Sequence, residues 1–211
     1  MMIKQFKPID SENSYYFELL AESEGYKVIA GIDEAGRGAL AGPVVAATVI
    51  LGRGFTLRGI DDSKKLSVKK RELLFDQIIK KSLASGYAMA SPSEIDSVNI
   101  LQATLLAMKR STARLTVEPD ILLVDGITPI KFGKPEWLII KGDNSSISIA
   151  AASIIAKVSR DRYMRSIAKE YPEYKFESNK GYPTASHIAS IEKYGLSPLH
   201  RASFRIRSIN R

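Results

Sequence analysis

The sequence contains no cysteine, and it has only two histidines in 211 residues. The absence of thiols excludes disulfide bonds and thiolate metal sites, and with so few imidazoles a zinc site is disfavoured. No apolar run reaches the roughly 20 residues that a membrane-spanning helix requires. The first residues, MMIKQFKPIDSENSYYF, lack the apolar centre of a secretion signal. We therefore expect a soluble cytoplasmic protein that does not associate with membranes.

Positive charge is in excess along the chain. Lys and Arg total 31 against 23 Asp and Glu, which gives a formal net charge of +8, and hydrophobic residues make up 45%. That hydrophobic fraction is enough for a folded core. A basic surface favours an anionic partner, most commonly nucleic acid, although the same charge can serve solubility alone.

Apolar runs alternate with helical patterns. Short β-branched runs predict strands, and apolar residues three or four positions apart predict helices. The predicted strands cover 27–33, 43–51, 86–91, 120–126 and 137–143, and the predicted helices cover 14–23, 66–82, 100–110, 146–170 and 186–195. This alternation predicts an α/β layered fold. We expect a lead-in at 1–26, an α/β domain at 27–170 and a helical annex at 171–211, and we expect a monomer because no heptad pattern is present.

Three of the predicted strands end in acidic residues. Asp33 and Glu34 close the first strand, and Asp125 and Asp143 lie at the ends of the last two. If these strands are neighbours, four carboxylates converge at one edge of the sheet, where their mutual repulsion raises their pKa values. Carboxylate oxygens prefer hard divalent cations, so the pattern predicts a site for Mg²⁺ or Mn²⁺.

Each acid also has a purely structural interpretation. Asp125-Gly126 is a common turn pair, Asp143 is placed to cap the helix that follows, and Asp33-Glu34 can be solvated. Successive side chains of a strand point to opposite faces, so Asp33 and Glu34 share a metal site only if the strand breaks between or just after them. Ala35-Gly36 is the expected position of that break.

Long motifs cover most of the chain after residue 26. They are GIDEAGRGALAGPVVAA at 31–47, DDSKKLS at 61–67, VDG at 124–126, KGD at 141–143, AAASIIAKVSRDRYM at 150–164, NKGYPTASH at 179–187 and YGLSPLHRASF at 194–204. Together they closely resemble the signature of type 2 ribonucleases H, the bacterial ribonuclease HII family. The resemblance implies a ribonuclease H-like mixed five-stranded sheet flanked by helices, with a small C-terminal helical subdomain. It also implies endonucleolytic cleavage of RNA in RNA–DNA hybrids and incision 5′ of single ribonucleotides in duplex DNA.

The resemblance also implies a role for individual residues. Metal binding and catalysis, with two ions expected when substrate is bound, would fall on Asp33, Glu34, Asp125 and Asp143. Ribose recognition would fall on the loop Gly36-Arg37-Gly38, phosphate contact on Lys64, and packing against the sugar on Tyr182. On this view the two adjacent acids serve the metals rather than balancing Arg37.

Further basic residues are candidates for neutralising the nucleic-acid backbone. They are Lys65, Lys180 and Arg160. Lys157 and Arg160 can equally lie on the solvated face of a helix. His187 and His200 are expected to be structural, because the metal route needs no imidazole.

Two other functions remain open from the sequence. A non-catalytic module that binds hybrids would share the basic charge, but clustered carboxylates facing a polyanion would hinder it. Another metal nuclease of the same fold, such as a junction resolvase or a ribonuclease HIII, would share the acids. The Gly-Arg-Gly loop, which ribonuclease HIII lacks, favours the type 2 enzyme.

Overall fold

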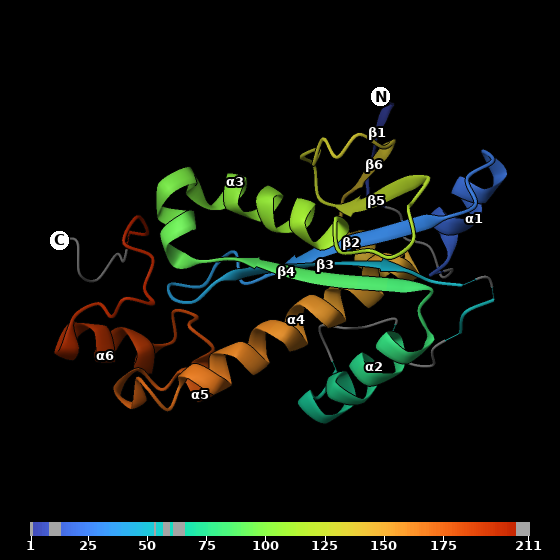
Figure 1. The fold of residues 1–211 in the computed structure, drawn as a ribbon. Coiled ribbons are helices and arrows are strands. Elements are labelled where there is room, and N and C mark those ends of the chain that lie inside the picture. Colours follow the sequence, from blue (N-terminus) through green and yellow to red (C-terminus); the bar gives the residue numbers. More distant parts are fainter. Residues whose placement is uncertain (1, 9–13, 53, 57–59, 61–65, 206–211) are drawn as a thin grey trace.

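A computed structural model describes residues 2–8, 14–52, 54–56, 60 and 66–205. Its centre is one six-stranded sheet in the order β1-β6-β5-β2-β3-β4 (Figure 1). The strands are β1 (Ile3–Phe6), β2 (Ile29–Ala35), β3 (Val44–Ile50), β4 (Ala84–Ala90), β5 (Ile121–Asp125) and β6 (Glu136–Ile139). β2, β3 and β4 pair antiparallel, whereas β2 with β5, β5 with β6 and β1 with β6 pair parallel. The mixed α/β sheet is confirmed.

The predicted number of five strands is wrong, because the lead-in contributes a sixth. β1 pairs in parallel with β6, more than 100 residues away in the sequence. Its Phe6 ring lies 5.1 Å from the rings of both Phe17 and Trp137. Only four residues long and half exposed, this edge strand is stabilised by a distant partner rather than by a local pattern.

Helices cover both faces of the sheet (Figure 1). α3 (Pro92–Thr112) lies on one face, and α2 (Val68–Lys81) and α4 (Ile147–Ile167) lie on the other. α1 (Tyr16–Ser23) packs beside β6, and the annex contains η2 (Pro172–Tyr174), α5 (Phe176–Asn179) and α6 (Ala185–Tyr194). None of the helices in the described ranges is long and apolar enough to cross a membrane.

The N-termini of the long helices follow simple capping chemistry. Ser67, Ser91, Ser146 and Thr184 each accept a backbone N–H from the first turn of the helix they precede. Ser91 also forms a capping box with Glu94, which starts α3 eight residues before the predicted position. Asn99, with a non-helical φ of 69°, divides α3 into two helical segments, and its Oδ1 accepts the Gln102 N–H, so the second segment begins at Ile100 as predicted.

α4 approaches the centre of the sheet very closely. A Cβ atom built on Gly31 of β2 would lie 2.1 Å from the backbone carbon of Ser148, so only glycine fits there. Small residues of α4, including Ala150, Ala151 and Ala152, are buried against the strands. This close packing holds α4 beneath the end of β2, where the acidic residues lie.

The annex shares its core with the rest of the molecule. Leu40 and Ala41 from the loop after β2 pack with Met164 of α4 and with Phe176 and Ile191. An isolated β-bridge joins Ala41 to His200. The loop after β2 is therefore enclosed by α4 on one side and by the annex on the other.

Candidate active site

β2 carries Asp33 and Glu34 as ordinary strand residues. They pair with Ala47 and Ala46 of β3, and the strand ends only after Ala35. Gly36 then adopts a φ of +96°, so the break lies just after the two acids, at the predicted position. Asp33 is 7% exposed, and its Oδ1 accepts the Glu34 N–H at 2.7 Å. The chain therefore leaves the sheet directly beyond the acidic pair.

Asp125 is the last residue of β5, the strand beside β2. Ile32 pairs with Val124, so Asp33 and Asp125 follow at the same end of neighbouring parallel strands. Burial, and then the charges of Glu34 and Asp125, hold the pKa of Asp33 well above its ordinary value, although Ser153 hydrogen-bonds to it. Burial also raises the pKa of Glu34, against the opposing influence of Arg37. These three carboxylates share one electrostatic environment.

Asp143 is not at a strand end. β6 stops at Ile139, Lys141 takes a left-handed φ of 57°, and Asp143 lies in the turn η1 (Gly142–Asn144). It is 6% exposed. The helix-capping interpretation is wrong, because Ser146 is the N-cap of α4. The turn is tied to the acidic site through Gly142, whose N–H donates to Asp125 Oδ1 at 2.8 Å.

The chemistry of these donors fits a hard divalent cation. All four side chains offer carboxylate oxygen, and the buried repulsion at Asp33 is the kind that a bound cation offsets. Within the described part of the chain, however, no three acidic or histidine side chains are drawn together as a ready coordination shell. A bound cation would have to draw these neighbouring carboxylates closer together.

The loop Gly36-Arg37-Gly38 follows directly. Gly36 is required by the protein itself, because an added Cβ would lie 2.0 Å from Nε of Arg160 at a positive φ. At Gly38 an added Cβ would meet nothing within 4 Å. Arg37 Nη1 lies 3.3 Å from Glu34 Oε1, with half of the arginine side chain exposed. The expectation that the acids do not balance Arg37 is therefore wrong for Glu34.

Two clefts meet at Glu34. One, of about 310 Å³, is lined by Glu34, Gly36, Arg71, Ser153, Lys157 and Tyr182. The other, of about 370 Å³, is lined by Glu34, Arg37, Asp125 and apolar residues that include Leu101 and Ile127. A larger apolar pocket of about 450 Å³ lies at the opposite end of β2, around Ile29, and contains none of the four acids. The two smaller clefts are the ones beside the candidate chemistry.

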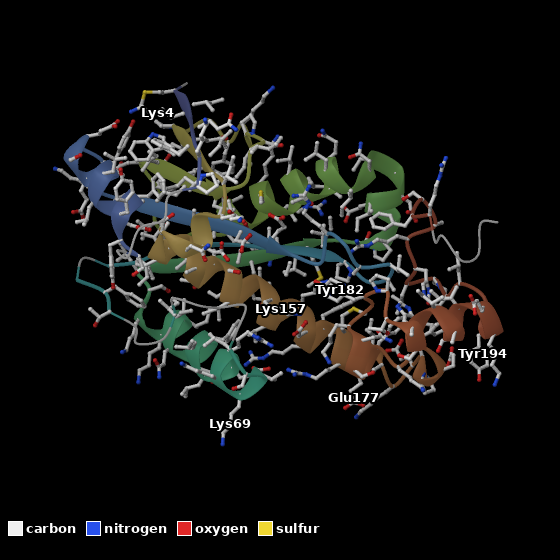
Figure 2. The ribbon with its side chains drawn as sticks, turned by 180° about the vertical axis from the view of Figure 1, so that it is seen from behind. Lys4, Lys69, Lys157, Glu177, Tyr182 and Tyr194 are labelled. Atoms are coloured by element: carbon white, nitrogen blue, oxygen red, sulfur yellow. The ribbon has the colours of Figure 1, made fainter. Side chains whose placement is uncertain are left out.

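Tyr182 stands in the first cleft between two cations. Its ring centre is 5.4 Å from Lys157 Nζ and 5.1 Å from Arg160 Cζ. Lys157 and Tyr182 are labelled in Figure 2. Arg160 is fully buried and donates to the carbonyls of Ala41, Pro43 and Lys180, so it is a structural residue and the phosphate-contact hypothesis is wrong for it.

The remaining lysines are placed unequally. Lys180 is partly buried two residues before Tyr182, its ammonium donates to the Glu177 carbonyl, and burial lowers its pKa. Lys64 and Lys65 lie outside the described residues. Arg71 and Ser153, which sequence reasoning missed, line the first cleft. In the sequence they look like ordinary helix residues, and only the packing of α2 and α4 brings them to the site.

A mixed sheet with carboxylates at the ends of its central strands is the architecture of ribonuclease H-like, metal-dependent hydrolases. The profile of the ribonuclease HII family matches residues 30–207. Ribonuclease HII of Syntrophotalea carbinolica is 52% identical over 198 residues, which cover 94% of this chain and 95% of the relative. The chain belongs to the ribonuclease HII family, and it is a ribonuclease H that acts on RNA–DNA hybrids.

Two solved structures agree with this fold. Archaeoglobus fulgidus ribonuclease HII, solved in a complex with PCNA, is 27% identical with a TM-score of 0.75, covering 86% of this chain and 96% of that one. Bst-RNase HIII in complex with Mn²⁺ is 19% identical with a TM-score of 0.71, covering 88% and 70%, and shows the fold alone. Because the chain belongs to a family of ribonucleases, the hypothesis of a non-catalytic binding module is wrong.

Proposed function

We propose that this enzyme, besides cleaving the RNA strand of hybrids, incises 5′ of single ribonucleotides embedded in duplex DNA. The products carry 5′-phosphate and 3′-hydroxyl ends. The observation that carries the proposal is the adjacency of the acidic site to the loop Gly36-Arg37-Gly38, with Glu34 between two clefts. An enzyme that recognises one ribose and cleaves beside it needs its recognition loop and its acidic site within one nucleotide of each other.

Asp33, Glu34, Asp125 and Asp143 would hold two divalent ions, Mg²⁺ or Mn²⁺, which supply an activated water and stabilise the leaving 3′-oxygen. The protein's own contribution is to place these carboxylates on rigid elements. Asp33 is held by Ser153 and the Glu34 N–H, and Asp125 by the Gly142 N–H. Arg37 pairs with Glu34 in the free protein and would release it to pair with a substrate phosphate.

Recognition of the ribose would use both clefts. The 2′-hydroxyl is the group that distinguishes RNA from DNA at one position, and an open glycine such as Gly38 lets backbone amides approach it. Tyr182 offers a flat ring on which the neighbouring deoxyribose packs, where a second 2′-hydroxyl would crowd. Lys180, Lys64 and Lys157 would neutralise phosphates along the groove.

The division of labour along the chain follows from these roles. Residues 27–170 would form the catalytic domain, residues 171–211 would complete the substrate groove, and residues 1–26 add an edge strand and a helix to the sheet. We propose that the enzyme acts as a cytoplasmic monomer.

The test uses a DNA duplex with one ribonucleotide, incubated with Mg²⁺, Mn²⁺ or EDTA. Metal-dependent incision on the 5′ side of the ribonucleotide is expected. Asp125→Asn should bind this duplex normally and lose cleavage by at least about 1000-fold, whereas Glu118→Gln, an exposed acid paired with Lys134, should cleave normally. Turnover by Asp125→Asn near that of the wild type would rule out the metal assignment.

Tyr182 is tested separately on the same duplex. Tyr182→Ala should lower kcat/KM for a single ribonucleotide by about 10-fold, because it removes the apolar ring surface on which the sugar packs and loosens the position of the substrate. Tyr182→Phe keeps the ring and should retain most activity. Equal activity of the alanine variant and the wild type would count against the sugar-packing role.

A further inference from the structure

Arg201 is buried beneath the loop that follows β2. Its side chain is 2% exposed and makes four hydrogen bonds, all to backbone carbonyls. Nη2 donates to Gly36 at 2.7 Å and to Gly42 at 2.9 Å, Nη1 donates to Arg37 at 2.9 Å, and Nε donates to Gly42 at 3.0 Å. A buried guanidinium held by carbonyls rather than by a carboxylate is costly, since burial lowers its pKa to about 9.

These contacts fix the orientation of two successive peptide groups. In a trans peptide the C=O and the following N–H point in opposite directions. The carbonyls of Gly36 and Arg37 both face Arg201, so the N–H groups of Arg37 and Gly38 both face away from it. In the part of the chain that the structure describes, neither N–H has an acceptor, and both residues are exposed. Adjacent N–H groups aimed the same way form a concavity for an electron-rich oxygen.

We propose that Arg201 is a positioning residue for ribose recognition: it holds the loop so that the amides of Arg37 and Gly38 converge on the 2′-oxygen of the substrate. This rests on the proposed function of the loop. Arg201 lies about 160 residues from the loop in sequence, and its segment is fixed by the Arg201 N–H donating to the Leu40 carbonyl at 2.9 Å. The annex thereby sets the selectivity of a loop that belongs to β2.

The decisive variant is Arg201→Lys, which keeps the charge but has all its donors on one nitrogen, whereas Arg201 donates from Nε, Nη1 and Nη2. On a duplex with a single ribonucleotide, kcat/KM should fall about 100-fold. The preference for that ribonucleotide over a 2′-fluoro nucleotide at the same position should fall by about 10-fold, because fluorine accepts amide hydrogen bonds poorly. The matched control is Ile191→Ala, which weakens the annex core around Leu40 and Ala41 but leaves the Arg201 hydrogen bonds to the Gly36 and Arg37 carbonyls in place. It should keep the wild-type preference even where it lowers thermal stability.

Backbone ¹⁵N relaxation of the free protein provides a readout that does not depend on activity. The amides of Arg37 and Gly38 should be rigid in the wild type and in Ile191→Ala, and should show lower order parameters in Arg201→Lys. Unchanged order parameters together with an unchanged 2′-hydroxyl preference would overturn the positioning role of Arg201. A wild-type enzyme that ignores single ribonucleotides would instead contradict the proposed function, while the relaxation data would still test the ordering of the loop.

Discussion

At the scale of single residues, the site combines groups that are unfavourable for folding. Asp33 is buried, and its carboxylate lies in the field of Glu34 and Asp125, so ionising it costs free energy in the protein without metal. A raised pKa of a carboxylate means that the folded state loses stability as the pH rises through the interval between the unfolded and folded pKa values. If Asp33 holds a metal ion as proposed, function and stability are opposed at this residue.

Asp33→Asn is expected to stabilise the metal-free protein by about 1–2 kcal/mol at neutral pH, because it removes a buried charge and keeps an acceptor for the Glu34 N–H. The same substitution should abolish cleavage, and it should reduce the rise in Tm that we expect Mn²⁺ to produce in the wild type. Thermal melts in EDTA and in Mn²⁺ measure both effects. A variant that melts lower than the wild type in EDTA would show that Asp33 is a net stabilising residue.

The two glycines of the loop form a matched pair. Gly36→Ala should destabilise the protein by about 2 kcal/mol or more, because the new Cβ overlaps the Arg160 side chain at a positive φ. Gly38→Ala meets no protein atom, so its unfolding free energy should stay within about 0.5 kcal/mol of the wild type.

Gly38→Ala, which should leave stability unchanged, should nevertheless impair cleavage. Gly38→Ala should lower kcat/KM for a single ribonucleotide by about 10- to 100-fold, because its Cβ projects where the substrate must approach. Denaturant unfolding and steady-state kinetics on the same preparation make the comparison. Full activity in Gly38→Ala would mean that the substrate does not approach Gly38.

At the scale of elements, the strands that form the centre of the sheet were predictable, because each is a continuous buried apolar run. β2 and β3 are buried along most or all of their length, and the acids that close β2 and β5 lie together as the sequence predicts. Asp143 shows the limit of this reasoning. The apolar run continues past Ile139, but the left-handed Lys141 ends the strand early, and no apolar pattern encodes that turn.

What the sequence could not predict depends on partners that are distant in the chain. β1 exists because β6 lies beside it, and Arg160 and Arg201 are buried because carbonyls from another part of the chain converge on them. Arginine is usually exposed, so a sequence pattern assigns such residues to the surface. Only the fold shows that these two cations organise the loop rather than bind phosphate themselves.

The annex also contains a pair of buried, hydrogen-bonded histidines, His187 and His200. The Ser197 N–H donates to His200 Nδ1 at 2.9 Å, which leaves the proton of His200 on Nε2. That proton then points to His187 Nε2 at 3.1 Å, and His187 Nδ1 donates to the Tyr182 carbonyl at 2.9 Å. Both rings must be neutral for this chain of donors to hold, as the expectation of structural histidines requires.

The pair predicts a loss of stability in acid. Burial lowers the pKa of His200 from 6.5 to about 4 and also lowers the pKa of His187. The unfolded chain therefore binds more protons than the folded one below pH 6.5, so stability is complete above that pH and declines as the pH falls toward 4. The loss of stability due to His200 between neutral pH and pH 4 is on the order of 3 kcal/mol.

His200→Asn isolates this contribution, since asparagine can accept the Ser197 N–H and does not titrate. Urea unfolding of both proteins at pH 7 and pH 4.5 gives the change in unfolding free energy of each. Because the two proteins have the same carboxylates, the difference between these two changes reports His200. The variant should be less stable than the wild type at pH 7 and should lose less stability on acidification. Parallel pH dependence in the two proteins would exclude the histidine pair as the acid-sensitive element.

At the scale of the whole molecule, α4 connects the functional parts. It carries Ser153 beside Asp33, Lys157 beside Tyr182, Arg160 against the loop and Met164 in the annex core. Figure 1 shows it running from beneath the sheet to the annex. Because one rigid helix contacts Asp33, the loop at Gly36 and Tyr182, the spacing of these three is set by helix geometry rather than by flexible connections.

The net charge of +8 leads to the last prediction, which concerns salt. Binding of a ribonucleotide-containing duplex by catalytically inactive Asp125→Asn should weaken steeply with salt. If about four phosphates are neutralised, log K should fall against log salt with a slope of roughly −3 to −4. Adding Lys180→Gln should reduce the magnitude of that slope by about one if Lys180, two residues before the cleft residue Tyr182, contacts a phosphate as proposed.

Lys4 is the matched control, because it lies on β1 at the far end of the molecule from Tyr182 (Figure 2) and pairs with Glu24. Adding Lys4→Gln to the inactive enzyme should weaken binding little and leave the slope unchanged, since a charge beyond about 10 Å is screened at 0.1 M salt. Fluorescence anisotropy between 50 and 200 mM KCl, at about these concentrations, resolves the slopes. Equal slopes for the two lysine variants would show that long-range charge, and not contact at the groove, attracts the duplex.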